Sequence, residues 1–121
     1  MDLNFEEEKC AMNIQLNYLY RDAWNFKKFH SVILSDIIVL EQIETYLKDQ
    51  TFFIPSEVGL PDLQEDIFKS YDHIWHEIEF LELTDQQPTV AIDASALLAN
   101  FKKANSLNWN EGEVFTRKGL M

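Results

Sequence analysis

The residues best suited to chemistry lie at 73–77, where the sequence reads HIWHE. Imidazole nitrogens and carboxylate oxygens bind divalent metals, and helical metal sites use comparable spacings. On a helix His73, His76 and Glu77 would share a face, whereas on a strand residues three apart point to opposite faces. We expect a strand here, so hydrogen-bonded structural histidines are favoured over a metal site. A metal-dependent hydrolase at these residues ranks last among the functions considered, and no cofactor is expected.

A second cluster, at positions 21–28, gathers basic and aromatic side chains in one short connection. Its candidate binding residues are Arg21, Trp24, Asn25, Phe26 and Lys27, and Asp22 and Lys28 lie among them. Aromatic rings and arginine are frequent anchors of protein interfaces. The competing interpretation is that Arg21 pairs with a nearby carboxylate while the aromatic rings cover the end of the core.

Catalytic signatures are otherwise missing from the sequence. No serine or cysteine lies in a nucleophile elbow, and no glycine-rich loop is present to bind phosphate. Glu77 and Glu79 lie two residues apart, but paired carboxylates are more often part of a solvated face than an acid/base pair. We therefore expect a protein that binds and does not catalyse.

Composition narrows the class of protein and partner. With 121 residues, 46% of them apolar, the chain fits one globular domain. A formal charge of −11 opposes binding to nucleic acid phosphates and would attract a basic partner. The single cysteine, Cys10, fits a reducing cytosol, and no apolar stretch approaches the ~20 residues of a membrane span. We expect a cytoplasmic protein without membrane contact.

Hydrophobic periodicity predicts the elements that position both clusters. Apolar residues alternate with polar ones over 12–20, which is typical of a half-buried strand. A second strand over 29–35 would complete a hairpin, and a helix would follow from a cap at Ser35 or Asp36 to about Gln50. A loop over 51–63, a strand over 74–83 and a helix from an Asp93 cap to Ala104 complete the pattern.

These elements predict an α+β fold in the order β-β-α-loop-β-α. A crossover after the hairpin would bring the third strand beside the first, giving a three-stranded antiparallel or mixed sheet of order 2-1-3 with two helices on one face. Residues 1–11 would form a flexible arm, 12–104 a single domain and 105–121 an irregular tail. The open sheet edge allows a monomer or a homodimer.

Three short motifs support a family resemblance. They are LYRDAWNFK at 19–27, FIP at 53–55 with VGLP at 58–61, and WHE at 75–77. Across roughly residues 14 to 90 the chain resembles a family of small, acidic, uncharacterised bacterial proteins. The resemblance implies a bacterial cytosolic protein with one compact domain, and it transfers no catalytic residue because the family has no assigned activity.

The sequence therefore predicts a non-enzymatic protein-interaction module that contacts an unidentified protein through Arg21, Trp24, Asn25, Phe26 and Lys27. The alternative is an acidic inhibitor or immunity-type protein that neutralises a basic partner.

Overall fold

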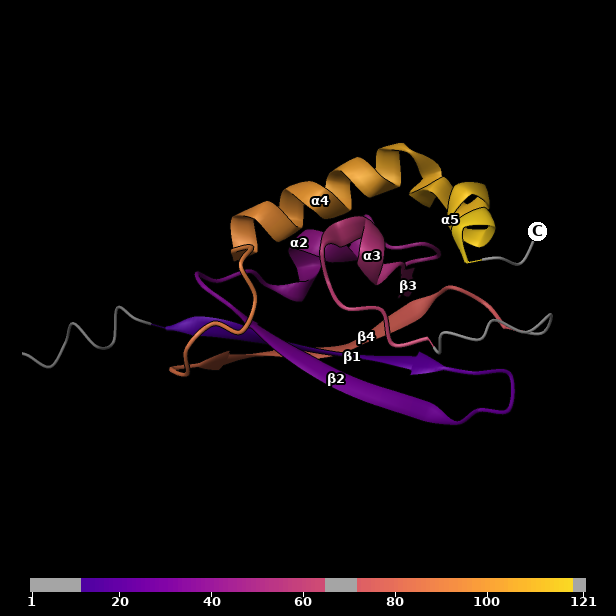
Figure 1. Cartoon of the computed structure of the whole chain (residues 1–121). Coiled ribbons are helices and arrows are strands. Elements are labelled where there is room, and N and C mark those ends of the chain that lie inside the picture. The colour runs from indigo at the N-terminus through magenta and orange to yellow at the C-terminus, as the bar shows by residue number, and fades with distance from the viewer. Residues whose placement is uncertain (1–11, 65–71, 119–121) are drawn as a thin grey trace, which may run out of the picture.

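The computed structural model describes residues 12–64 and 72–118, so the expected arm at 1–11 lies outside the described residues. The elements are β1 Asn13–Arg21, β2 Lys27–Leu34, α2 Leu40–Glu44, β3 Phe52–Phe53, α3 Pro55–Val58, β4 His76–Thr84, α4 Ala94–Ser106, the 3₁₀ helix η1 Asn108–Asn110 and α5 Glu111–Arg117. The helices lie together over one face of an antiparallel sheet (Figure 1). The α+β class is therefore confirmed.

Strand β1 is the centre of the sheet, as its alternating sequence predicts. It pairs antiparallel with β2 on one side and with β4 on the other. The buried side chains Ile14, Leu16, Tyr18 and Tyr20 point toward the helices, because alternate residues of a strand share one face. The strand expected at 74–83 is thus found beside the first strand.

The sheet has four strands in the order β2-β1-β4-β3, so the expected three-stranded sheet was incomplete. The fourth strand lies inside the segment expected to be a loop, where Phe52 and Phe53 pair with Glu77 and His76. A two-residue strand has no alternation to read, and Pro55 begins a helix directly after it.

The helix expected from a cap at Ser35 or Asp36 to Gln50 was wrong at both ends, since α2 spans only Leu40–Glu44 and its N-cap is Val39. Asp49 and Gln50 take positive φ angles of 52° and 59°, which a right-handed helix cannot contain. They reverse the chain so that Phe52 pairs with Lys48: the Lys48 N–H donates to the Phe52 carbonyl at 2.7 Å. Apolar spacing predicted the helix, and this turn replaced its second half.

The segment at 76–84 is a strand and not a helix, as expected, but its side chains do not alternate strictly between the two faces. The β1–β4 register slips between Asn17 and Tyr18, whose partners are Phe80 and Ile78. The extra residue, Glu79, forms a β-bulge, and Ile78 and Phe80 therefore point to opposite faces of the sheet. Ile78 packs on the core, whereas Phe80 lies on the uncovered face.

The C-terminal segment was expected to be irregular, and that expectation was wrong. Helix α4 begins at the predicted cap, where the Asp93 carboxylate accepts from the Ala96 N–H at 2.8 Å, but it continues to Ser106. The three residues of η1, at 108–110, take positive φ and turn the chain into α5. This turn inserts Trp109 into the core, beside Phe101.

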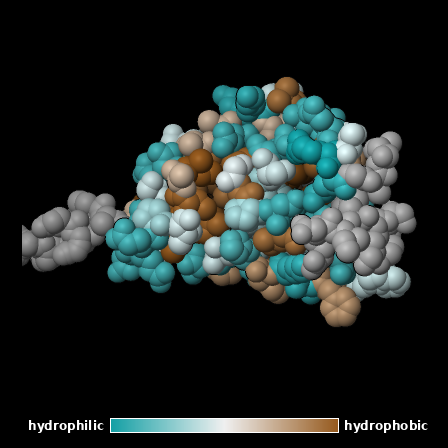
Figure 2. Space-filling view, viewed as in Figure 1, coloured by the Kyte–Doolittle hydropathy of each residue, from teal (hydrophilic) through white to brown (hydrophobic). Residues whose placement is uncertain are grey.

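The core lies between the sheet and the helices. In Figure 2 hydrophobic side chains gather in this band, whereas hydrophilic ones dominate the outer helical surface. Its largest fully buried side chains include Trp109, Tyr18, Phe53, Phe101 and His76. Among the described residues, no helix has the length and apolar character required to cross a bilayer.

Candidate functional site

The β1–β2 hairpin closes with a turn that one carboxylate braces. Asp22 Oδ1 accepts from the N–H groups of Trp24 and Phe26, both at 2.9 Å. Across the turn the Asp22 N–H donates to the Phe26 carbonyl at 3.0 Å, and Asn25 takes a positive φ of 68°. Asparagine tolerates this conformation better than most residues. The turn is therefore pre-organised, which lowers the entropic cost of binding a partner.

The aromatic side chains of this hairpin tip, which we define as residues 21–29, point into solvent. Trp24, Phe26 and Phe29 are 70%, 74% and 60% exposed. They do not cover the end of the core, so the packing interpretation of Trp24 and Phe26 is wrong. Trp24 and Phe26 lie on the turn and Phe29 near the start of β2, so the hairpin tip exposes three aromatic rings.

Arg21 fixes the base of the tip to β4. Its Nε donates to Glu77 Oε2 at 2.9 Å and its Nη2 to Glu77 Oε1 at 3.2 Å, while Nη1 donates to Asn25 Oδ1 at 2.7 Å. The hydrogen bonds from Arg21 lower the pKa of Glu77, and the same bonds raise the pKa of Arg21. One guanidinium thus joins the turn, β1 and β4.

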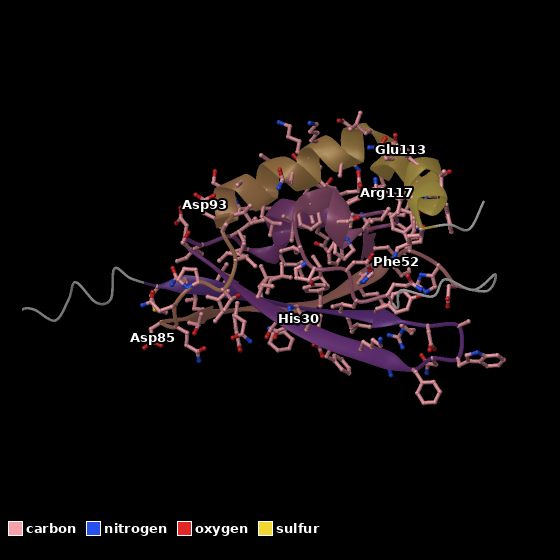
Figure 3. The ribbon with its side chains drawn as sticks, in the orientation of Figure 1. His30, Phe52, Asp85, Asp93, Glu113 and Arg117 are labelled. Carbon is pink, nitrogen blue, oxygen red and sulfur yellow. The ribbon has the colours of Figure 1, made fainter. Side chains whose placement is uncertain are left out.

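A cavity of about 410 Å³ opens beside this ion pair. It is lined by Arg21, Asp22, Phe52, His73, Trp75 and Glu77. These residues come from the end of β1, from β3 and from the chain entering β4, and Figure 3 shows Phe52 on the hairpin side, between helices and sheet. The structure therefore unites two clusters that lie some fifty residues apart in the sequence.

His73 is held by its neighbours and is not open to a ligand. Its Nε2 lies 2.6 Å from the Arg21 carbonyl, and its Nδ1 accepts from the Trp75 N–H at 3.0 Å. These partners place the ring proton on Nε2. The Tyr20 ring packs 4.9 Å away, and the Tyr20 hydroxyl donates to the His73 carbonyl at 2.9 Å. Both ring nitrogens of His73 are therefore used in fixing the hairpin base.

His76 lies in the core, with 1% of its surface exposed. Its Nε2 accepts from the Leu63 N–H at 3.1 Å, and its Nδ1 lies 3.3 Å from the Ile74 carbonyl. Burial lowers the pKa of His76 to about 4, although Asp62, with Oδ1 3.5 Å from Nε2, opposes the shift. His76 is therefore a neutral structural residue that holds the loop before β4.

The metal candidates His73, His76 and Glu77 do not converge. His73 points to the Arg21 backbone, His76 enters the core, and Glu77 binds Arg21. In the described part of the chain, no three His, Cys, Asp or Glu side chains are placed to hold a metal ion. His30 contacts Tyr18, whose ring lies between His30 and His76. Strand alternation applies only to His76 and Glu77, because His73 precedes β4.

The sequence did not identify the aromatic walls of the cavity. Phe52 lies in a two-residue strand with no alternation, and Trp75 precedes β4 although the expected strand over 74–83 included it. A more open hollow of about 730 Å³ lies over the C-terminal turn and α5, and Leu107, Asn108, Gly112 and Phe115 are among its lining residues. It contains none of the predicted site residues.

Searches against protein-family models, curated proteins and solved structures found no match to this chain. The family resemblance of the three sequence motifs therefore stays a prediction.

Proposed function

We propose that this protein is a non-enzymatic protein-interaction module whose contact surface is the hairpin tip. The observation that carries the proposal is the exposure of Trp24 and Phe26 on a turn braced by Asp22, with Phe29 exposed on the adjoining strand. Rigid aromatic residues give large contact area at small entropic cost, because few rotatable bonds are immobilised on binding. A braced turn adds to this advantage because its backbone is already ordered.

The charge of the tip indicates the chemistry of the partner. Arg21, Lys27 and Lys28 supply three of the chain's ten basic residues, whereas the whole chain has a formal charge of −11. A partner surface with an apolar groove and flanking carboxylates would match the rings and the lysines. The occupied nitrogens of His73 and the ion pair of Glu77 further support a binding role over catalysis.

Site-specific photo-crosslinking tests this proposal. A benzoylphenylalanine at position 26 should crosslink one defined protein in native cytosol, and the same group at position 107 should not. Leu107 is a matched control because it is also an exposed apolar residue, 48% accessible, but lies in the C-terminal turn. Equal crosslinking from the two positions, or none from position 26, would contradict the proposal.

The acidic inhibitor is the second candidate, and the excess of 21 acidic over 10 basic residues favours it. Charge-driven inhibition should weaken steeply as salt is raised from 50 to 500 mM, because added ions screen surface charges. Binding anchored by the aromatic tip should change far less over this range. The salt dependence of the crosslinked partner's affinity therefore separates the two candidates.

A further inference from the structure

Strand β2 forms one edge of the sheet, with β1 on its inner side. Two observations show which of its backbone groups point outward. Ile33 donates its N–H to Thr89 Oγ1 and accepts from the Thr89 N–H, each at 2.9 Å, so Ile33 faces away from β1. The Asp22–Phe26 bond across the turn places the even-numbered residues of β2 toward β1. The odd-numbered residues therefore face outward.

The outward backbone groups of β2 between the turn and Ile33 belong to Lys27, Phe29 and Ser31. All three residues are exposed, and within residues 12–64 and 72–118 their outward N–H and C=O groups have no hydrogen-bond partner. At one end the open edge stops at Ile33, whose backbone groups bond to Thr89. At the other end it stops at Lys27, where β2 begins after the turn. The open edge thus contains three hydrogen-bonding residues arranged symmetrically about Phe29.

We propose that β2 pairs antiparallel with β2 of a second copy of this chain, across a two-fold axis at Phe29. Phe29 would then face Phe29 of the second copy, and Lys27 would face its Ser31. Each open N–H of one copy would donate to an open C=O of the other, and the same surface is used on both copies, as in an isologous interface. The two sheets join into one, and the pairing ends where Thr89 blocks the edge.

Side chains agree with this register. Phe29 lies on the uncovered face of the sheet, beside its cross-strand neighbour Leu19, so the two Phe29 rings would form a cross-strand aromatic pair. Lysines on an edge strand normally discourage pairing, but here no lysine faces another lysine. Lys27 faces serine, and Lys28 faces His30.

Charge complementarity favours a second copy as the occupant. Residues 27–34 hold two lysines and no carboxylate. The opposite end of the molecule exposes Asp36, Asp85 and Asp93, and Figure 3 shows Asp85 and Asp93 far from the hairpin turn. Antiparallel pairing brings the tip of each copy, which holds Arg21, Lys27, Lys28 and one carboxylate, Asp22, toward the acidic end of the other. In this register Asp22 lies opposite Asp36, but the two ends carry opposite net charges although each chain is strongly acidic.

This inference goes beyond the proposed function, because it concerns the backbone edge of β2 and a second copy of the chain, and it does not depend on the protein contacted by the turn. Crosslinking through engineered cysteines in a Cys10→Ser background tests the register. Phe29→Cys should form a disulfide-linked dimer on mild oxidation, since facing Cα atoms in such a pair lie about 5.5 Å apart. Ser31→Cys is the matched control, because its two copies would lie about 13 Å apart. A mixture of Lys27→Cys and Ser31→Cys chains should crosslink with each other.

Sedimentation equilibrium tests the association without any added cysteine. The chain should sediment as a dimer at high concentration, and Phe29→Ala should weaken dimerisation at least tenfold. Phe80→Ala should change it less than twofold, because Phe80 is exposed on the same face but lies on β4. A monomer at every concentration, or disulfide formation by Ser31→Cys as fast as by Phe29→Cys, would overturn the pairing. Either result would leave selective crosslinking of a different protein from position 26 unaffected.

Discussion

Acid should destabilise this protein through His76 before most carboxylates are protonated. Burial holds the pKa of His76 at about 4, against its ordinary value of 6.5 in the unfolded chain. As pH falls below 6.5, His76 binds a proton in the unfolded chain but stays neutral in the folded chain. The stabilisation is therefore complete above pH 6.5 and is lost progressively as pH falls to about 4.

The size of the effect follows from the gap between the two pKa values. A gap of this size corresponds to about 3 kcal/mol of unfolding free energy, a large share of the stability of a small domain. The charged neighbours of His76 have opposite effects on its pKa: Asp62 raises it, whereas His73 and Lys118 lower it. Burial remains the largest contribution, so the direction is set by desolvation.

Urea unfolding followed by tryptophan fluorescence at pH 7.5, 6.0, 5.0 and 4.0 measures this dependence. His76→Gln retains a side chain that can accept from the Leu63 N–H but cannot be protonated. It should remove about 3 kcal/mol of the pH dependence, whereas His30→Gln, at an exposed position, should leave it in place. If His76→Gln and the wild type lose the same free energy between pH 7.5 and 4.0, burial does not keep His76 neutral.

Two further predictions concern the turns. Asp22→Ala should raise amide hydrogen exchange at Trp24 and Phe26 and lower the unfolding free energy by about 1 kcal/mol, by analogy with a lost helix cap. Asp22→Asn keeps the accepting oxygen and should not. Equal exchange in the two variants would refute this. Trp109→Ala should cost about 3–5 kcal/mol in urea unfolding because the ring is fully buried. Trp109→Phe should cost much less, since in the described structure the indole N–H has no hydrogen-bond partner. Equal losses for these two variants would contradict that account.

The sequence predicted those parts of the fold that depend on a repeating pattern. Alternation identified β1, and the Asp93 cap with its apolar stripe identified α4. Two of the differences lie where consecutive residues take positive φ. Asp49 and Gln50 shortened α2, and the left-handed run around Trp109 turned an expected tail into helices that cover the core. Periodicity carries no information about such turns.

The candidate site divides in the same way. Residue types alone predicted the hairpin tip, since arginine and aromatic residues in a short connection are typical of binding surfaces. The contact between Arg21 and Glu77 depends on the β1–β4 register, and the cavity wall at Phe52 depends on a two-residue strand. Both are long-range pairings, which local spacing cannot specify.

The affinity of the Trp24→Ala variant for the partner crosslinked at position 26 tests the central claim most directly. Titration calorimetry at 150 mM salt should show a loss of at least about thirtyfold, equivalent to about 2 kcal/mol, as expected for a hot-spot aromatic residue. Leu107→Ala should bind within twofold of the wild type. Wild-type affinity in Trp24→Ala would show that the hairpin tip is not the contact surface.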